Sequence, residues 1–345
     1  MAVCCVRTSA FKAGLLTQQL GSISAAPLAR TLKIGVVYNK HSGRHQKRWG
    51  TQKFPDGIPA IQAKTPAQVH AALEQLAEQQ VNLLVIAGGD GTVQSVLSEV
   101  MLNQNFEHRP LIALIPTGST NMTGTDVGTV DLRHGGWQRL QEWATNPCDL
   151  QQRIVHRPVL KIEPGGSRPA FCGMFFGAGA IYHAVQHTQK NLHGLGLRGD
   201  VGPGLALMRF AKSVAGRDRR YFNPVNVSVR DADGRTVEGE NILLLASTLN
   251  RLLLNLHPFW GQEDAPVHWT TVAEGARGFL RKLPAVCRGQ GKKLRPEHGY
   301  TSHNSERIEL LFDGGFIVDG EFFEARIDDG PVVLSSAGDA AFLNL

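Results

Sequence analysis

A continuous apolar run that ends in a glycine-rich turn constrains this chain more than any other feature of its sequence. Leu83–Ala87 has the pattern of a parallel β-strand covered on both faces. Val93–Met101 then has the apolar spacing of a helix. A strand, a glycine turn and a helix N-terminus present backbone N–H groups and a positive dipole end to a phosphate. We therefore predict a site for a nucleotide triphosphate at Gly88-Gly89-Asp90-Gly91-Thr92, whose glycines can take positive φ and let the ligand approach the main chain.

Asp90 is the residue in this turn that phosphate binding alone does not explain. A carboxylate repels polyphosphate unless it holds a metal ion or receives a proton, so Asp90 indicates phosphoryl transfer and an indirect Mg²⁺ contact. The alternative is an ordinary strand-to-helix connection that glycine makes tight. The strand before the turn, the helix after it and the Asp-Gly-Thr sequence favour the phosphate site.

Similar strand and turn units lie on both sides of this motif. Leu32–Tyr38 and Pro110–Pro116 are predicted strands, and the second leads into the polar turn Thr117–Asn121. Thr65 and Pro66 have the character of an N-cap and a first helical residue. Repeated units of this kind predict a doubly wound parallel sheet that binds its ligand at the carboxyl ends of the strands.

After about residue 150 the pattern changes to short β-rich runs separated by turns, which predicts an antiparallel β domain. Helical insertions are expected at Gly202–Arg217 and Ala273–Cys287. We expect an N-terminal extension without fixed structure (1–30), an ATP-binding α/β domain (31–150) and a β-sandwich domain (151–345) whose last residues alternatively pack back on the first domain. The predicted strands are Val159–Glu163, Val225–Arg230, Asn241–Ser247, Val267–Val272, Arg307–Phe312, Gly315–Val318 and Pro331–Ser335.

Composition restricts the class of protein. No apolar run is long enough to cross a bilayer, and 42% hydrophobic with 19% charged residues is typical of a soluble globular protein. The net charge of +6 suits anionic partners such as nucleotides or an anionic membrane surface, and no motif indicates a nucleic-acid partner. The five scattered cysteines lack metal-ligand spacing, which favours reduced thiols in a cytoplasmic protein.

Together the motifs resemble the diacylglycerol kinase catalytic-domain family, which includes bacterial lipid kinases and sphingosine kinases. That family has a first nucleotide-binding turn, a glycine-rich motif, a proline-x-glycine-threonine-x-asparagine turn and a closing aspartate-glycine-glutamate motif. In this chain they correspond, in family order, to Asn39-x-x-Ser42-Gly43, Gly88-Gly89-Asp90-Gly91-Thr92, Pro116-x-Gly118-Ser119-x-Asn121 and Asp319-Gly320-Glu321.

The resemblance implies a kinase that uses ATP and Mg²⁺ to phosphorylate a lipid hydroxyl in a cleft between two domains. It implies that Glu321 accepts the proton of the lipid hydroxyl and that Asp319 supports the metal or the acceptor. It also implies a structural Mg²⁺ near Glu263-Asp264-Ala265, with Asp264 as a ligand. The expected ATP contacts are Asn39, Ser42, Gly43, Thr65, Gly88, Gly89, Asp90, Gly91, Thr92, Gln94, Gly118, Ser119 and Asn121.

Several positions depart from the family pattern. Gln94 and Ser95 stand where family members usually carry asparagine and glutamate, and Met122 stands where an aspartate usually follows. Ala265 replaces a glycine of the structural metal turn. Two alternatives to a lipid kinase therefore stay open. One is an NAD kinase-like enzyme with a soluble acceptor, and the other is a nucleotide-binding regulatory relative without turnover.

Some motifs also have purely structural interpretations. Asp319-Gly320-Glu321 is also typical of a tight hairpin turn with solvated acids, and the Asn39 turn is typical of an Asx turn. For Asn121, a hydrogen bond that stabilises the loop is as good an explanation as a ligand contact.

An apolar stretch at Leu252–Trp260 is followed by a basic segment that extends to Arg295. Such a pair predicts contact with an anionic membrane, here the inner membrane face, where a lipid acceptor would be met. The alternative is a buried strand and a solvated helix face. The expected partners are thus ATP and a membrane lipid, and a homodimer stays open.

Overall fold

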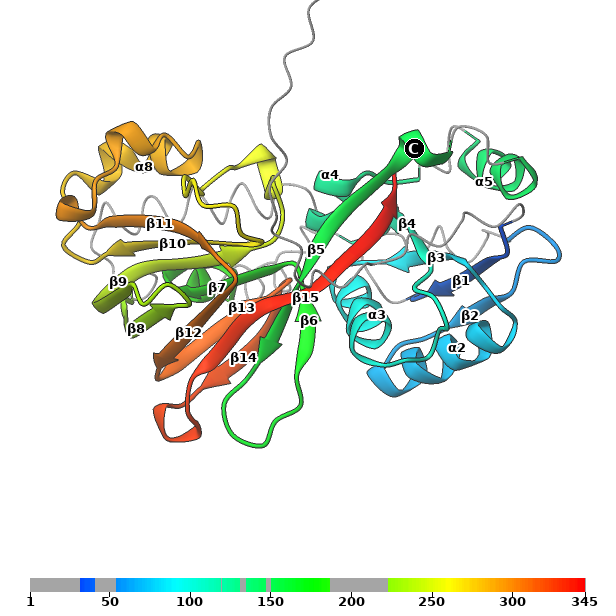
Figure 1. The fold of residues 1–345 in the computed structure, drawn as a ribbon, viewed down its shortest axis with the longest axis horizontal. Helices are drawn as coiled ribbons and strands as arrows, with labels where there is room; N and C mark the ends of the chain where they lie inside the picture. The colour runs from blue at the N-terminus through cyan, green and yellow to red at the C-terminus, as the bar shows by residue number, and fades with distance from the viewer. Residues whose placement is uncertain are drawn as a thin grey trace, which may run out of the picture.

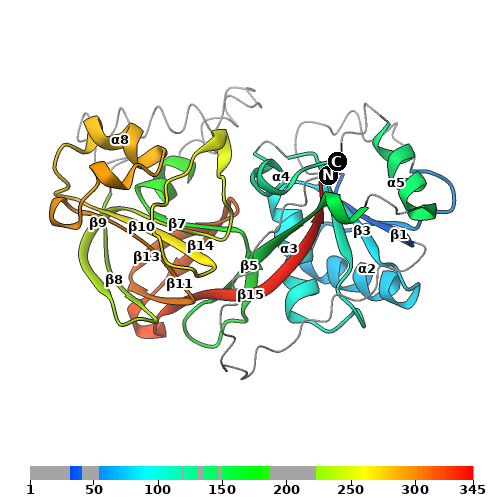
Figure 2. The same ribbon diagram turned by 45° about the horizontal axis from the view of Figure 1, so that its top comes forward.

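The computed structural model describes residues 32–40, 54–118, 120–130, 135–146, 150–186 and 223–344. It shows an α/β half and a β-rich half (Figure 1). Two long strands, β5 (Ile154–Glu163) and β15 (Val332–Leu343), run from one half into the other. The turned view shows the same arrangement (Figure 2). The expected extension at 1–30 and the expected helix at Gly202–Arg217 lie outside the described residues.

The α/β half contains a parallel sheet in the order β2-β1-β3-β4. Three of these strands confirm the apolar runs of the sequence: β1 (Ile34–Tyr38), β3 (Leu83–Gly88) and β4 (Leu111–Pro116). The edge strand β2 (Ala60–Gln62) was not predicted from the sequence. It has three half-buried residues, which is too short a run for a period to show.

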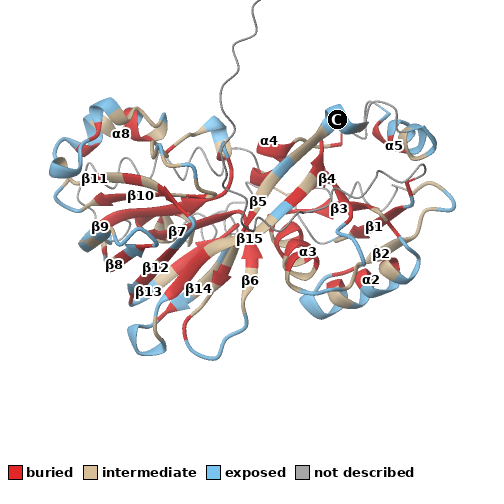
Figure 3. Ribbon diagram, viewed as in Figure 1, coloured by how far each residue is buried: buried red, intermediate tan, exposed pale blue. Residues whose placement is uncertain are grey.

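Helices cover both faces of this sheet, as the doubly wound prediction requires. Ile86 of β3 packs in one core with α2 (Pro66–Glu78) and α3 (Asp90–Leu102). Its neighbour Val85 packs on the opposite face with α5 (Gly136–Thr145). Successive side chains of a strand point to opposite faces, so an unbroken apolar strand needs cover on both. The buried residues of β1 and β3 follow this pattern (Figure 3).

The helix boundaries match the capping signals of the sequence only in part. Thr65 caps α2 by accepting a hydrogen bond from Gln68 N at 3.3 Å, with Pro66 as the first helical residue, as predicted. The helix expected from Ala273 is shorter, because Ala273 ends strand β10 and α8 covers only Phe279–Cys287. The short helix α4 (Met122–Val127) was not predicted.

No helix in the described part of the chain is both long enough and apolar enough to cross a membrane.

The β-rich half is antiparallel throughout, in the order β14-β13-β7-β9-β8-β12-β15, with β10 paired to β9 and β11 to β10. Its core contains the fully buried Phe176, Trp269, Phe312 and Phe316. The predicted combination of a parallel α/β half and an antiparallel β half is therefore confirmed. The strands are β6 (Phe171–Gly173), β7 (Phe175–Gly179), β8 (Val225–Asp231), β9 (Thr236–Ser247), β10 (Val267–Ala273), β11 (Tyr300–Ser305), β12 (Arg307–Phe312), β13 (Gly314–Val318) and β14 (Glu321–Ala325).

Candidate active site

The glycine turn connects the carboxyl end of β3 to the first turn of α3. Gly89 caps the helix with extended backbone angles (φ −92°, ψ −178°), and Thr92 N donates to Gly89 O at 3.0 Å. By helix geometry the amides of Asp90 and Gly91 have no carbonyl partner inside the helix. These N–H groups and the helix dipole favour an anion at this end of α3.

None of Gly88, Gly89 and Gly91 takes the positive φ that glycine permits. The missing side chains allow close approach instead. A Cβ on Gly91 would lie 2.7 Å from Glu321 Oε1. A Cβ on Gly118 would lie 2.8 Å from Gly89 Cα. The turn is thus glycine-rich because a second turn and a carboxylate pack directly against its main chain.

The turn after β4 is fastened to the glycine turn. Thr117 N donates to Gly88 O at 3.0 Å. The Asn121 side chain closes the turn, since Gly118 N donates to Asn121 Oδ1 at 3.1 Å and Asn121 Nδ2 donates to Gly118 O at 2.9 Å. The structural interpretation of Asn121 is therefore the one that the geometry shows, with both ends of its amide used inside the turn.

Asp90 links these two turns through its side chain. One carboxylate oxygen accepts a hydrogen bond from Met122 N at 2.9 Å, and the other accepts one from the Thr120 hydroxyl. Burial raises the pKa of Asp90, and the hydrogen bonds from Thr120 and Met122 oppose that rise. Asp90 therefore holds the second turn in position, a contact that sequence reasoning did not anticipate.

The closing motif forms the tight turn between β13 and β14. Val318 pairs with Glu321, and the two residues between them have positive φ, +50° at Asp319 and +92° at Gly320. A two-residue loop with both φ values positive matches the right-handed twist of the strands it joins. The hairpin interpretation is thus correct for the backbone, although only Glu321 is exposed.

Asp319 is buried and faces the β-rich half. Its carboxylate accepts hydrogen bonds from Met174 N at 2.9 Å and from Phe175 N at 3.0 Å. Burial, together with the nearby charges of Asp90 and Glu321, raises the pKa of Asp319 to about 8. The two acids of the motif therefore differ in surroundings, with Asp319 tied to the main chain and Glu321 facing the glycine turn.

A side chain of α3 joins the two halves next to this contact. Ser98 Oγ accepts a hydrogen bond from Cys172 N at 2.9 Å and lies 3.3 Å from Cys172 O. This pair holds β6 against α3 (Figure 1). The hairpin with Glu321 also lies at Gly91, although the two residues are far apart in the sequence. We regard the end of α3, the turn after β4 and this hairpin as one candidate active site.

The other expected contact residues surround the same sheet edge to different degrees. Asn39 follows β1, and its N–H donates to Ala87 O at 3.0 Å. Thr65 caps α2. Gln94 is buried in α3, and its Nε2 has no hydrogen-bond partner among the described residues. The expected contacts outside the described residues are Ser42, Gly43 and Ser119.

Residues 33–165 match the family model of the Diacylglycerol kinase catalytic domain. The resemblance to the diacylglycerol kinase catalytic-domain family is confirmed. The matched residues include the glycine turn, Asp90 and the turn after β4. They place this part of the chain in a kinase-like family.

Solved structures share the fold with this chain. A crystal structure of a diacylglycerol kinase from Bacillus anthracis str. Sterne is 16% identical, with a TM-score of 0.56, and the match covers 91% of this chain and 97% of that chain. Two further structures from the same organism are 17% identical, with a TM-score of 0.59, and cover 91% of this chain and 98% of theirs. A search of curated proteins gave no match.

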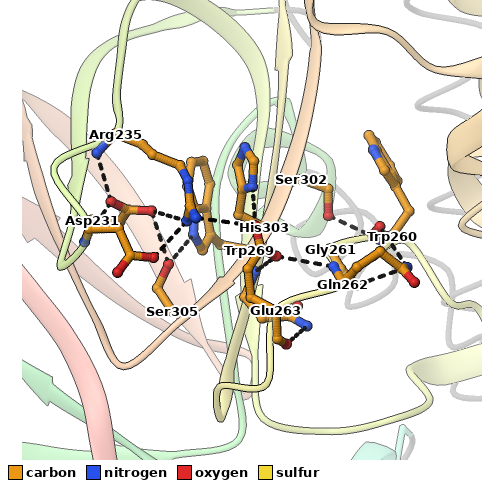
Figure 4. A network of polar contacts seen from close by, with 12 residues as sticks. Asp231, Arg235, Trp260, Gly261, Gln262, Glu263, Trp269, Ser302, His303 and Ser305 are labelled. Atoms are coloured by element: carbon orange, nitrogen blue, oxygen red, sulfur yellow. Dashed lines mark hydrogen bonds and ion pairs between the residues drawn. The ribbon is translucent and has the colours of Figure 1, made fainter.

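The structural metal that the family resemblance implied has no assembled ligand set in the described ranges. No group of three acidic, histidine or cysteine side chains suited to a metal occurs there, and Asp264 is exposed. Glu263 instead lies 2.6 Å from His303 Nδ1, accepts from Asn304 N at 3.0 Å and is 3.6 Å from Arg235 (Figure 4). Partial burial raises the pKa of Glu263, but the hydrogen bonds from Asn304 and His303 outweigh this effect and lower the pKa to about 2. The chain's own donors thus satisfy this acidic turn, and we do not propose a metal at Asp264.

Sequence reasoning missed the groups that hold the two buried aspartates. Thr120 lies inside a polar turn that the sequence predicts. An acid and a hydroxyl that both follow strands of one parallel sheet could have indicated its hydrogen bond to Asp90. Met174 and Phe175 interact with Asp319 only through backbone amides. A backbone donor carries no sequence signature, so this contact needed the fold.

Proposed function

We propose that this protein is a kinase that uses ATP and Mg²⁺ to phosphorylate the hydroxyl of a lipid of the diacylglycerol or sphingoid-base type. The single observation that carries the proposal is the approach of the Glu321 carboxylate to Gly91 at the start of α3. It brings a proton acceptor next to a group of backbone amides that favours phosphate.

The phosphates of ATP fit the end of α3. The amides of Asp90 and Gly91 point to the site by helix geometry, and an anion there is favoured by the dipole. Gly118 lets the turn after β4 pack directly against Gly89, because it has no side chain there. We propose that Asn39, Thr65 and the other expected residues of this sheet edge contribute the remaining ATP contacts.

The donor set also fits Mg²⁺ in the way that kinases use it. Mg²⁺ binds through one or two carboxylates together with substrate phosphates and waters, and it neutralises the charge that develops on the phosphoryl group. Asp90 has both carboxylate oxygens hydrogen-bonded to the second turn. We therefore propose an indirect, water-mediated contact for Asp90, whose main role is to position the turn after β4.

In the proposed reaction the acceptor oxygen forms a bond to the γ-phosphorus while the bond from that phosphorus to the bridging oxygen of ADP breaks. The proton of the acceptor hydroxyl moves to the Glu321 carboxylate, which is exposed and beside Gly91. Asp319 acts as a positioning residue, because its hydrogen bonds to Met174 N and Phe175 N fix the hairpin that carries Glu321.

The test is transfer of radiolabel from γ-labelled ATP with Mg²⁺ into a panel of diacylglycerol, sphingosine, a whole-cell lipid extract and NAD. We expect label in a lipid product. Label in NAD alone would show a kinase for a soluble acceptor. ATP binding without transfer to any acceptor would show a regulatory relative, and it would overturn the kinase proposal.

A further inference from the structure

The outer face of α8 combines apolar and basic side chains. Phe279 and Val286 are buried against the β-rich half. At about 100° per residue, the side chains one, two, five and nine positions after Phe279 fall within one arc on the opposite side. All four are exposed, and Leu280 keeps 45% of its surface in solvent. They are Leu280, Arg281, Pro284 and Arg288.

The charge of this region has one sign. No acidic residue occurs between Arg277 and Arg295 in the sequence. Among the exposed cations there, Arg295 alone pairs with a described carboxylate, Glu297 at 3.5 Å. The surface around α8 is therefore strongly positive and attracts anions. The exposed cations are Arg277, Arg281, Arg288, Lys292, Lys293 and Arg295.

An apolar tip lies next to this basic face. Leu252 N donates to Leu256 O at 2.8 Å and closes a tight loop. Leu254 and Asn255, at its tip, both have left-handed backbone angles (φ +58° and +57°). This conformation costs energy in residues that carry a side chain. The strained loop leaves Leu254 52% exposed, the most exposed large apolar side chain of the described residues.

The tip and the helix are joined into one surface. His257 N donates to Cys287 O at 2.9 Å, which ties the end of the loop to the end of α8. At its other end, Arg251 N donates to Asp126 in α4 at 3.1 Å. Both views show α8 and this loop on the same side of the molecule (Figures 1 and 2). Since α4 follows the turn after β4, the surface lies beside the half that carries the candidate active site.

We propose that this surface docks the protein on a bilayer with anionic headgroups. In this arrangement Leu254 and Leu280 enter the boundary of the acyl chains, while the cations lie among the headgroups. An exposed aliphatic tip in a strained loop suits a lipid surface, and it would gain nothing on a nucleic-acid backbone. The inference rests on the proposed function, because an enzyme for a membrane lipid must reach it from the bilayer. We call Leu254, Leu280, Arg281, Arg288, Lys292 and Lys293 the docking face.

The test measures binding to vesicles of phosphatidylcholine, with and without phosphatidylglycerol, by co-sedimentation. We expect binding that requires phosphatidylglycerol and weakens with salt. Arg281→Glu should lower the binding constant about 25-fold, since it changes the charge by two units and each unit charge near an anionic surface contributes roughly fivefold. Arg139→Glu on the exposed face of α5 makes the same charge change and should alter binding less than about twofold.

A second pair of variants tests the apolar side chains of the docking face. Leu254→Ser should weaken vesicle binding about tenfold, whereas Ile327→Ser, at a side chain 46% exposed on another loop, should have little effect. Far-ultraviolet circular dichroism and the midpoint of thermal unfolding check that each variant is folded. Equal vesicle binding by wild type, Arg281→Glu and Leu254→Ser would overturn the inference, as would no binding by wild type.

Transfer to an acceptor in detergent micelles separates the two proposals. Docking variants that lose vesicle binding but keep the micellar kcat/KM support the docking face and the kinase together. Vesicle binding that depends on the docking face, without turnover of any lipid, would support the surface and overturn the kinase. Binding of an RNA oligonucleotide with the same residue dependence, and no vesicle binding, would show that the partner is a nucleic acid and overturn the inference.

Discussion

Glu321 and its close neighbour in the sequence, Glu324, lie in the same strand and face different surroundings. Both are exposed on β14, but only Glu321 lies at the start of α3. We expect Glu321→Gln to lower kcat at least about 100-fold, because an amide cannot accept the proton of the hydroxyl. The affinity for ATP, measured by calorimetry, should stay within about twofold. Glu324→Gln should leave both unchanged, and unimpaired turnover of Glu321→Gln would remove Glu321 from the proposed role.

Gly91 permits a test that separates stability from activity. Its added Cβ would lie 2.7 Å from Glu321 Oε1, which is the far end of a flexible, exposed side chain. Glu321 can therefore move away at little cost, and alanine favours the helix by up to about 1 kcal/mol. We expect Gly91→Ala to be at least as stable as wild type and to lose about 10- to 100-fold in kcat/KM.

Gly275→Ala is the control for this substitution, because nothing lies within 4 Å of its added Cβ. It should leave turnover unchanged. A Gly91→Ala protein with normal turnover would show that the position of Glu321 is not critical.

At the scale of elements, α3 joins the two halves through Ser98 and Cys172. Ser98→Ala leaves Cys172 N without its acceptor in a partly buried place, so we expect a loss of about 1–3 kcal/mol in the free energy of unfolding. Ser95 is the control on the same helix, since within the described part of the chain its hydroxyl donates only to Gly91 O of that helix. Ser95→Ala should cost less than about 0.5 kcal/mol in chemical denaturation. Equal losses would show that the contact between α3 and β6 does not depend on Ser98.

The elements that could be predicted from the sequence are those whose own residues determine them. The apolar run of β3 and the capping residues of α2 are local signals, and the structure confirms both. β7 could not be predicted, because Phe-Phe-Gly-Ala-Gly resembles a glycine-rich loop and is a strand only through pairing with β9 and β13. Likewise Gly275 and Gly278 lie before α8, which explains why that helix begins later than predicted.

The candidate site divides in the same way. The glycine turn, the turn after β4 and the closing hairpin were recognisable as motifs, and the structure brings their described residues together. The hydrogen bonds that hold these turns in place could not be predicted, because Asp319 accepts from backbone amides at the start of β7, a strand that the sequence does not indicate. Ligand contacts of the individual residues stay predictions.

At the scale of the whole molecule, the buried acid between the halves links stability to pH. The pKa of Asp319 is raised to about 8 in the folded protein, against an ordinary value of 3.8 for an aspartate. Asp319 therefore binds its proton more tightly in the folded state than in the unfolded state. The stability that this group contributes is fully present below about pH 4 and is lost as pH rises towards 8. Across that window we expect the contribution of Asp319 to the free energy of unfolding to fall as pH rises, by at most about 1.4 kcal/mol per pH unit.

Asp319→Asn tests this dependence, because the amide keeps the shape of the side chain and does not titrate. Chemical denaturation at several pH values between 4 and 8 should show a flatter dependence in the variant than in wild type. An unchanged slope would assign the pH dependence to other groups.

Strand β15 bears on how the chain can be assembled. It pairs with β12 and β5 in the β-rich half, and its far end lies beside β4 at Phe342 and Ile112. The division near residue 150 stays a prediction, since β5 and β15 run through both halves. During translation the β4 edge emerges early. Val130 N, which donates to Leu114 O at 2.7 Å, covers part of that edge, but its partner strand is missing until Phe342 has been made. The first half therefore cannot complete its sheet on the ribosome before the second half has been synthesised, and it carries a strand edge that is only partly covered throughout that interval.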